Sequence, residues 1–437
     1  MMLVAIVGGA VAGSEAALVC AERGVHAVVF ERGARPYGKI EDGLPRWHEK
    51  LRDKEYARID ASLNRPEVRF VPRTTIGEDL SFERLRACGF SAVILANGAW
   101  RDRALPIEGI GAFVGRGLYY QNPLVHWFNH HEEPGYAGPE LELSEGALVV
   151  GGGLASIDVV KLLSLETWSK ALRARGIDAD VVSLEHRGIP AFCEANGVDP
   201  RSIPIRPPTL VYRRDAEDMP LADFAEDATE EQRAKTRVAR RRILERVMER
   251  YHVAFLPKRA PVGMEVVDGR LRGLVLRETE LVEGRVREKP GSDHVVASEL
   301  VVSSIGSIPE PIAGVPMRGE LYDFADFETG ALRGLDRVFG LGNVLTGRGN
   351  IRDSRQNAKL VAERLVGTRE RDDPALSKVA DDAHHEAHEN AERVLDAALA
   401  GAGHADLTSI DALVRERWAT VGYDGDYARW MATHRAG

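Results

Sequence analysis

Residues 3–13 read LVAIVGGAVAG, a short apolar run that leads directly into a glycine-rich turn, and a helical pattern over residues 14–23 follows. Gly8 permits the tight turn and Gly13 lets the helix pack closely on the strand, while the N–H groups at the helix N-terminus suit a pyrophosphate. The middle glycine of the usual GxGxxG spacing is Ala10, which leaves a phosphate less clearance. The alternative is an ordinary glycine turn in some other α/β sheet.

Two further strands support a dinucleotide site at this turn. A predicted strand over residues 27–30 ends at Glu31, where a carboxylate is expected to hold the ribose hydroxyls of an adenosine group. Another predicted strand runs into Asn97 and Gly98, a pair similar to the stretch that closes many FAD domains. We therefore predict an FAD site. Its residues so far are Gly8, Ala10, Gly13, Glu31, Asn97 and Gly98.

A second unit of the same kind begins about 140 residues later. Two such units in one chain indicate dinucleotide binding far more specifically than either turn alone. Residues 146–150 predict a strand, residues 151–156 read GGGLAS, and an apolar helix is expected over 157–165. We predict that Gly151, Gly153, Leu154 and Ala155 contact a second nucleotide.

Arg213 and Arg214 follow a predicted strand at the position where an NADH site carries an acidic residue. Guanidinium groups there suit a 2′-phosphate by charge and by bidentate hydrogen bonding. The pattern favours NADPH over NADH. The alternative is that both side chains are merely solvated at the end of a strand.

The composition and the cysteine spacing limit the classes of protein that this chain can belong to. The chain has 437 residues, of which 44% are hydrophobic and 29% charged, which is enough for two or three globular domains. No apolar run approaches a membrane span or a signal peptide, so we expect a cytoplasmic protein that binds neither membrane nor nucleic acid. Cys20, Cys88 and Cys193 form no CxxC pair and no metal-binding spacing, which argues against a disulfide relay and against a resident metal.

The expected fold class is α/β, with two Rossmann-like domains and a helical C-terminal extension. Pro309 and Pro311 mark a return to the first domain, and the chain becomes charged and alanine-rich after about residue 366. We predict a discontinuous FAD-binding domain, an inserted NADP-binding domain and a helical extension. Their bounds are 1–105 with 315–366, 106–314, and 367–437.

In the extension, Thr408 is the expected cap of a helix whose apolar positions are Ile410, Leu413, Val414 and Val421. His384 and His388 lie four residues apart and could bind a metal with Asp381, but we favour solvated histidines. The aromatic residues near the C-terminus either pack over the FAD domain or make a subunit contact. They are Trp418, Tyr423, Tyr427 and Trp430.

Several of these residues together resemble the adrenodoxin-reductase-like ferredoxin–NADP reductases and the related glutamate synthase small subunit, over roughly residues 3–365. The likeness is carried by Pro36-Tyr37-Gly38, Gly43 and His48, by Ser156-Ile157-Asp158, by Tyr212-Arg213-Arg214, and by residues 338–343 and 347–351. It implies that His48 lies near the flavin and Asp158 near the nicotinamide. It also implies that Gly38, Gly342, Asn343, Gly349, Asn350 and Ile351 contact the cofactors.

The chain departs from these families at Asn343, which replaces aspartate or tryptophan, and at Asn350, which replaces a glycine. We therefore expect the geometry toward substrate or electron acceptor to differ from that of these families. The small subunit's cysteine-rich iron–sulfur module is not expected either, since the FAD strand starts at residue 3.

The resulting hypothesis is a reductase that passes hydride from NADPH to FAD and electrons to a ferredoxin or flavodoxin. No GxSxG elbow or paired-carboxylate motif suggests other chemistry. Because such carriers are acidic and this chain has a net charge of −9, docking needs a local basic face. Arg237, Arg240, Arg241 and Arg242 offer one, unless they form a solvated helix face without a partner. The alternatives are a reductase subunit feeding a dedicated partner enzyme and a non-catalytic flavin-binding redox sensor.

Overall fold

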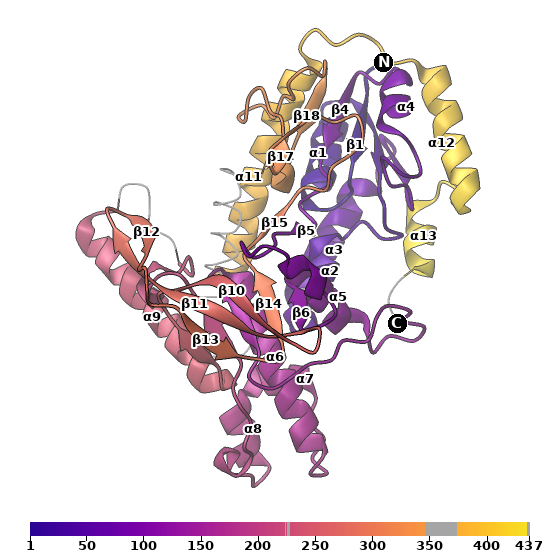
Figure 1. Cartoon of the computed structure of the whole chain (residues 1–437). Coiled ribbons are helices and arrows are strands. Elements are labelled where there is room, and N and C mark those ends of the chain that lie inside the picture. The colour runs from indigo at the N-terminus through magenta and orange to yellow at the C-terminus, as the bar shows by residue number, and fades with distance from the viewer. Residues whose placement is uncertain (223, 225–227, 346–373, 435–437) are drawn as a thin grey trace.

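Two parallel five-stranded sheets organise the chain (Figure 1), and the computed structural model describes residues 1–222, 224, 228–345 and 374–434. The first sheet has the order β18-β4-β1-β2-β3. Its strands are β1 (Leu3–Val7), β2 (His26–Phe30), β3 (Val68–Val71), β4 (Ala92–Leu95) and β18 (Val338–Gly340). The α/β class, with Rossmann-like parallel sheets and a helical C-terminus, is confirmed.

The centre of the first sheet is β1, which pairs in parallel with β2 and β4 and is buried along its whole length. An uninterrupted apolar strand of this kind is what a parallel sheet covered on both faces requires. Helix α1 (Val11–Glu22) follows β1 and packs on α3 (Glu49–Leu63). The late strand β18 pairs with β4, so residues far apart in the sequence share this sheet. The exact domain bounds stay a prediction.

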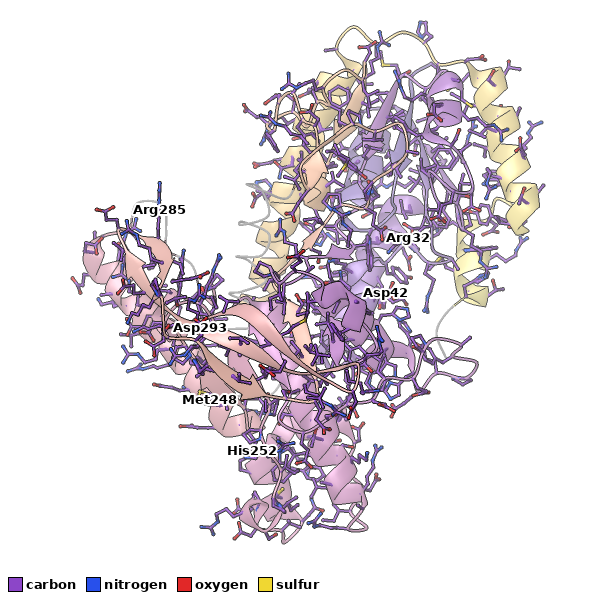
Figure 2. The ribbon with its side chains drawn as sticks, in the orientation of Figure 1. Arg32, Asp42, Met248, His252, Arg285 and Asp293 are labelled. Atoms are coloured by element: carbon purple, nitrogen blue, oxygen red, sulfur yellow. The ribbon has the colours of Figure 1, made fainter. Side chains whose placement is uncertain are left out.

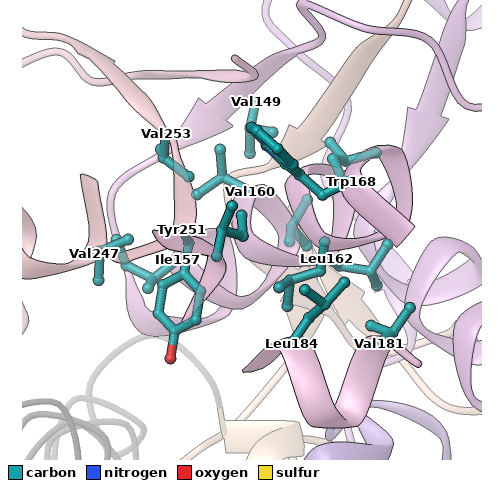
Figure 3. Close-up of a cluster of buried hydrophobic side chains, with 14 of the residues drawn as sticks. Val149, Ile157, Val160, Leu162, Trp168, Val181, Leu184, Val247, Tyr251 and Val253 are labelled. Carbon is teal, nitrogen blue, oxygen red and sulfur yellow. The ribbon is translucent and has the colours of Figure 1, made fainter. Parts of the chain in front are cut away.

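The second sheet has the order β6-β14-β7-β8-β9 and carries the second glycine turn after β7. Its strands are β6 (Leu118–Tyr120), β7 (Leu148–Gly151), β8 (Thr209–Val211), β9 (Ala254–Leu256) and β14 (Val301–Ser304). The first sheet with the helices packed on it forms the first unit, and the second sheet with its helices forms the second unit. Helix α6 (Leu154–Arg173) is longer than the predicted helix and buries Ile157, Val160 and Trp168 in the core of the second unit (Figure 3).

A smaller antiparallel sheet stands beside the second unit (Figure 1). It consists of β10 (Arg259–Val267), β11 (Arg270–Val282), β12 (Arg285–Glu288) and β13 (His294–Ala297). Helix α9 (Glu230–Tyr251) packs on α6 in the core of the second unit. Helix α9 begins with a capping box in which Thr229 and Gln232 exchange side-chain-to-backbone hydrogen bonds.

The C-terminal helices pack on both faces of the first sheet (Figure 1). Helices α11 (Pro374–Leu399) and α13 (Tyr427–Thr433) share a core with α1, and α12 (Leu407–Val421) packs on the opposite face. Ile410, Leu413 and Val414 are buried, as their spacing predicts.

The prediction that Thr408 caps α12 was wrong. The Asp406 side chain accepts from the backbone N–H groups of Thr408 and Ser409, because a carboxylate one residue before the helix reaches two free N–H groups at once. The aromatic tail packs over the first unit: the indole N–H groups of Trp418 and Trp430 donate to the carbonyls of Phe70 and Ala34.

Shorter elements connect these layers. They are α2 (Lys39–Asp42), η1 (Arg46–His48), α4 (Phe82–Ala87), β5 (Arg101–Asp102), η2 (Ile110–Phe113), α5 (Gln121–His130), α7 (Val181–Arg187), α8 (Ile189–Ala195), η3 (Pro200–Ser202), η4 (Ala216–Asp218), β15 (Ser307–Ile308), β16 (Met317–Arg318), β17 (Leu321–Tyr322) and η5 (Gly342–Leu345). Among the helices in the described part of the chain, none combines the length and apolar character that crossing a bilayer demands.

Candidate functional site

The first glycine turn is too crowded for any side chain at Gly8 or Gly13. A Cβ on Gly13 would lie 1.8 Å from the carbonyl oxygen of Gly8, and a Cβ on Gly8 would lie 2.6 Å from that of Ala96. Gly8 also has a φ of 95°, in the region that favours glycine. The turn therefore brings the N-terminus of α1 close against β1 and β4, as the dinucleotide pattern predicts.

The alanine in the middle of this turn is accommodated by a glycine elsewhere. A Cβ on Gly38, whose φ is 51°, would lie 2.8 Å from the Cβ of Ala10. The methyl group of Ala10 thus occupies the space that Gly38 leaves. Gly342 approaches the same helix terminus, since its own Cβ would lie 2.6 Å from that of Ala12. Both segments thus lie against the first turn, and the cofactor contacts that the family resemblance implies for Gly38 and Gly342 stay a prediction.

Glu31 lies buried beneath this turn and accepts hydrogen bonds from the backbone N–H groups of Gly9, at 2.7 Å, and Gly33, at 2.8 Å. Burial raises the pKa of Glu31, and the two N–H groups oppose this shift. A carboxylate has about four lone-pair positions, so two remain for hydroxyl donors. Glu31 is therefore suited to hold a ribose.

Asn97 and Gly98 close the site from β4. The Asn97 amide donates to the Tyr322 hydroxyl at 3.1 Å, whereas its buried Oδ1 finds no hydrogen-bond partner among the described residues. A buried acceptor of this kind normally has a partner, so a ligand donor fits here.

Trp100 is a site residue that the sequence reasoning missed. A Cβ on Gly98 would lie 3.5 Å from its indole nitrogen, and one on Gly38 would lie 3.8 Å from its ring. The guanidinium of Arg32 (labelled in Figure 2) stacks 4.1 Å above the same ring. The only signal was an aromatic residue two positions after the Asn97-Gly98 turn.

A polar cluster that the sequence did not suggest joins the two units beside Trp100. Lys39 donates to Ser307 at 3.0 Å, and the backbone N–H of Asn122 donates to the carboxylate of Asp102 at 3.2 Å. Asn122 also donates through its side chain to the Trp100 carbonyl. Burial lowers the pKa of Lys39 to about 8 and raises that of Asp102 to about 6. Both groups therefore titrate near neutral pH.

The second glycine turn is equally tight. A Cβ on Gly151 would lie 2.4 Å from the carbonyl oxygen of Ser304, and one on Gly152 would lie 2.0 Å from the ring of Tyr212. Gly153 instead borders open space and is the N-cap of α6, whose first residues are Leu154 and Ala155. The open N-terminus of a long helix suits a phosphate.

Arg213 and Arg214 follow β8 directly after Tyr212, so they lie at the same sheet edge as the second turn. Arg213 is exposed, and Arg214 is partly buried with an Nε that has no hydrogen-bond partner among the described residues. The placement matches the prediction. Their role toward a 2′-phosphate stays a prediction.

His48 and Asp158 come together at the junction of the two units, although 110 positions separate them. The Nε2 of His48 lies 3.5 Å from Oδ2 of Asp158 and 3.1 Å from the indole nitrogen of Trp47. Both side chains are buried. Burial alone would raise the pKa of Asp158, but His48 and Lys161 hold it below its usual value, so Asp158 is ionised.

Lys161 continues this buried network. Its ammonium donates to Glu185 at 2.9 Å and lies 3.6 Å from Asp158 and 4.9 Å above the ring of Trp47. Burial alone would lower the pKa of Lys161, but Glu185, Tyr251 and Asp158 hold it above its usual value. The sequence reasoning missed this lysine, because charged residues in an apolar helix are usually assigned to its surface.

Three predictions need correction or fall outside the structure. Gly349, Asn350 and Ile351 lie outside the described residues. Arg240 is buried rather than directed to solvent, since its guanidinium donates to the carbonyls of Ala222 and Glu217.

His384 is also not solvated. Its Nδ1 lies 3.0 Å from Glu15 and its Nε2 lies 2.7 Å from Glu55, and all three side chains are buried. The two carboxylates come from α1 and α3, so only the docking of α11 creates this contact.

No known family model matches the chain. It is 29% identical over 164 residues to the mitochondrial NADPH:adrenodoxin oxidoreductase of Arabidopsis thaliana, which covers 37% of this chain and 32% of the relative. It is 32% identical over 168 residues to a probable ferredoxin/ferredoxin–NADP reductase of Mycobacterium bovis, and this match covers 38% of this chain and 28% of the relative. The match to a putative glutamate synthase [NADPH] small chain of Cereibacter sphaeroides is 25% identical over 382 residues and covers 83% of this chain and 77% of the relative.

Mycobacterium tuberculosis FprA, solved in complex with NADPH, superposes with a TM-score of 0.58 over 91% of this chain and 90% of that one, at 20% identity. The chain has the FprA fold. The resemblance in sequence to adrenodoxin-type and ferredoxin–NADP reductases and to glutamate synthase small chains is confirmed, although the match spans only about a third of the length of the first two relatives.

Proposed function

We propose that this chain is an FAD-dependent oxidoreductase that takes hydride from NADPH and passes electrons to a ferredoxin-like carrier. The observation that carries the proposal is the pair of glycine turns, each on its own parallel sheet, with the His48–Asp158 contact between them. Relatives named as NADPH-dependent reductases support it. We further propose that the protein works in the cytoplasm.

The residues of the first turn fit FAD. Glu31 would hold the adenosine ribose, the N-terminus of α1 would face the pyrophosphate, and the Oδ1 of Asn97 would accept from the cofactor. When bound, FAD supplies hydride acceptance and the release of single electrons. The polypeptide needs no nucleophile or general base for this chemistry.

The second turn fits NADPH. The N-terminus of α6 would bind the pyrophosphate, and Arg213 and Arg214 would bind the 2′-phosphate. We propose that Asp158 and His48 position the nicotinamide end, with Lys161 keeping Asp158 ionised and immobile. His48, Asp158 and Lys161 are all buried, so this network is shielded from bulk solvent.

We propose that the exposed part of α9 receives the carrier. Arg241 and Arg242 are exposed and Arg237 is partly so, which gives an acidic protein a basic surface. Arg241 already pairs with Glu217, so its net charge contribution is reduced. Arg240 is excluded, because it is buried and bonded to backbone carbonyls.

The test is stopped-flow reduction of the bound flavin by NADPH and by NADH, in the wild type and in the Arg213→Ala/Arg214→Ala double variant. We expect rapid bleaching by NADPH, a preference over NADH of roughly tenfold or more, and loss of that preference in the double variant. The matched control is Arg201→Ala, an exposed arginine that pairs with Asp199 and should leave the preference unchanged. Absence of bleaching with either nucleotide would refute the proposal.

The match to the glutamate synthase small chain, which extends over 83% of this chain, favours a second candidate: a reductase subunit that feeds a dedicated partner enzyme. Addition of ferredoxin and cytochrome c to the reduced protein separates the two. Fast cytochrome reduction supports the ferredoxin-type reductase, and its absence in a protein that still bleaches supports the subunit. A protein that binds FAD but is bleached by neither NADPH nor NADH would indicate the non-catalytic sensor.

A further inference from the structure

Two histidines of α5 face an aspartate of α2 at a point that the proposed reaction does not use. The Nε2 of His130 lies 3.0 Å from Oδ1 of Asp42, and the Nε2 of His126 lies 4.0 Å from the same oxygen. One ligand atom from each of the three side chains lies within 4.8 Å of the others. The histidines are four residues apart, so they project from the same face of the helix.

Two imidazoles and one carboxylate are donors that zinc prefers. Tetrahedral zinc with bonds of roughly 2.0–2.1 Å separates neighbouring donors by about 3.3 Å. The observed separations are close enough for small rotations of the side chains to reach that geometry. We propose that Asp42, His126 and His130 bind a divalent transition-metal ion, zinc foremost, and leave its fourth position open to water.

The surroundings of His130 support this assignment. Its second ring nitrogen, Nδ1, lies 2.9 Å from a carboxylate oxygen of Glu133. Histidines that bind metals almost always donate their other N–H to a carboxylate or carbonyl, which orients the ring and raises its basicity. His130 is buried, Asp42 is partly buried and the side chain of His126 is 50% exposed, so an ion can enter from solvent.

The location gives the ion a structural effect. Helix α2 follows β2 of the first sheet, whereas α5 follows β6 of the second sheet. Asn129 already joins the two, because its amide donates to the carbonyls of Glu41 and Leu44. Figure 2 labels Asp42 at this junction. A metal bound here would cross-link the two units and restrict their relative motion.

The experiment uses the full-length chain without a histidine tag, stripped of metal by a chelator. Isothermal titration with Zn²⁺ measures affinity and stoichiometry, and the absorption of added Co²⁺ reports tetrahedral coordination. The variants are His126→Ala, His130→Ala, Asp42→Asn and Glu133→Gln. The matched control is His131→Ala on the next residue, because that ring stacks on Trp127 and bonds to its carbonyl instead.

We expect one zinc ion per chain in the wild type and in His131→Ala. Affinity should fall by at least about tenfold in each ligand variant and by about 10- to 100-fold in Glu133→Gln. Zinc should raise the unfolding temperature of the wild type but not that of His126→Ala, whose exposed position keeps the metal-free fold intact. Binding that is absent, or equally strong in His126→Ala and the wild type, would overturn the proposal.

Discussion

Removal of the His384 side chain should destabilise the protein far more than removal of its neighbour. His384 lies between Glu15 of α1 and Glu55 of α3, and all three side chains are buried. His384→Leu would leave two carboxylates without their shared partner in a site of low polarity. Loss of one member of a buried ionic group costs about 3–5 kcal/mol.

The chain offers a matched control on the same helix. His385 is exposed and, among the side chains that the structure describes, pairs with Glu389, so His385→Leu should change the free energy of unfolding by no more than about 0.5 kcal/mol. In the triple variant Glu15→Met/Glu55→Met/His384→Leu both carboxylates and the imidazole are gone, and His388, which lies 3.4 Å from Glu15, keeps its contact with Glu22. The triple variant should recover most of the loss, because apolar replacement of a whole buried ionic group is often neutral.

The stabilisation should also depend on pH. Burial alone would lower the pKa of His384, but Glu15 and Glu55 raise it above its usual value against the opposing charge of Arg58. The stabilisation is therefore complete below about pH 6.5, the pKa of an unfolded histidine, and is lost as the pH rises through the higher folded pKa. Urea unfolding of wild type and His384→Leu from pH 5 to 9, on the order of five points, measures this difference. Equal losses for His384→Leu and His385→Leu, or a difference that grows with pH, would refute the reasoning.

The remaining predictions concern the two glycine turns and the junction between the units. Gly151→Ala should lower the free energy of unfolding by about 1–3 kcal/mol, because the new methyl group meets a backbone carbonyl, whereas Gly153→Ala should cost less than about 1 kcal/mol. Urea unfolding without nucleotide compares them, and equal losses would contradict the crowding. Lys39→Met should stabilise the protein by about 1–2 kcal/mol at neutral pH, since burial lowers the pKa of Lys39 to about 8. The folded state then binds fewer protons than the unfolded state above that pH, so wild-type stability rises and the advantage of the variant disappears by about pH 10.4. An advantage that persists at high pH would show that lost packing or hydrogen bonding, rather than charge, is responsible.

The local parts of the fold could be predicted from the sequence because short-range rules govern them. A strand, a glycine turn and a helix follow one another within about twenty residues, and the crowding at Gly13 and Gly151 is a property of that turn itself. Glu31 could be predicted in the same way, because it directly follows the next strand, β2. The contact between His48 and Asp158 required the family resemblance, since nothing local relates the two.

Other features depend on how distant segments pack. His384 could not be placed, because its two glutamates lie 369 and 329 positions away and become neighbours only when α11 docks on α1 and α3. Arg240 was misplaced for a related reason: the carbonyls that accept from it belong to the segment between β8 and α9, which the periodicity of the helix does not reveal.

The sequence by itself determined that this chain has two glycine turns, each between a strand and a helix, and which residues form them, because hydrophobic pattern and glycine spacing act over a few residues. Only the tertiary structure decided which charged groups are buried together. Burial of a charge depends on partners that the folded chain brings from other elements, as it does for Lys161 with Glu185 and for Asp42 with His130.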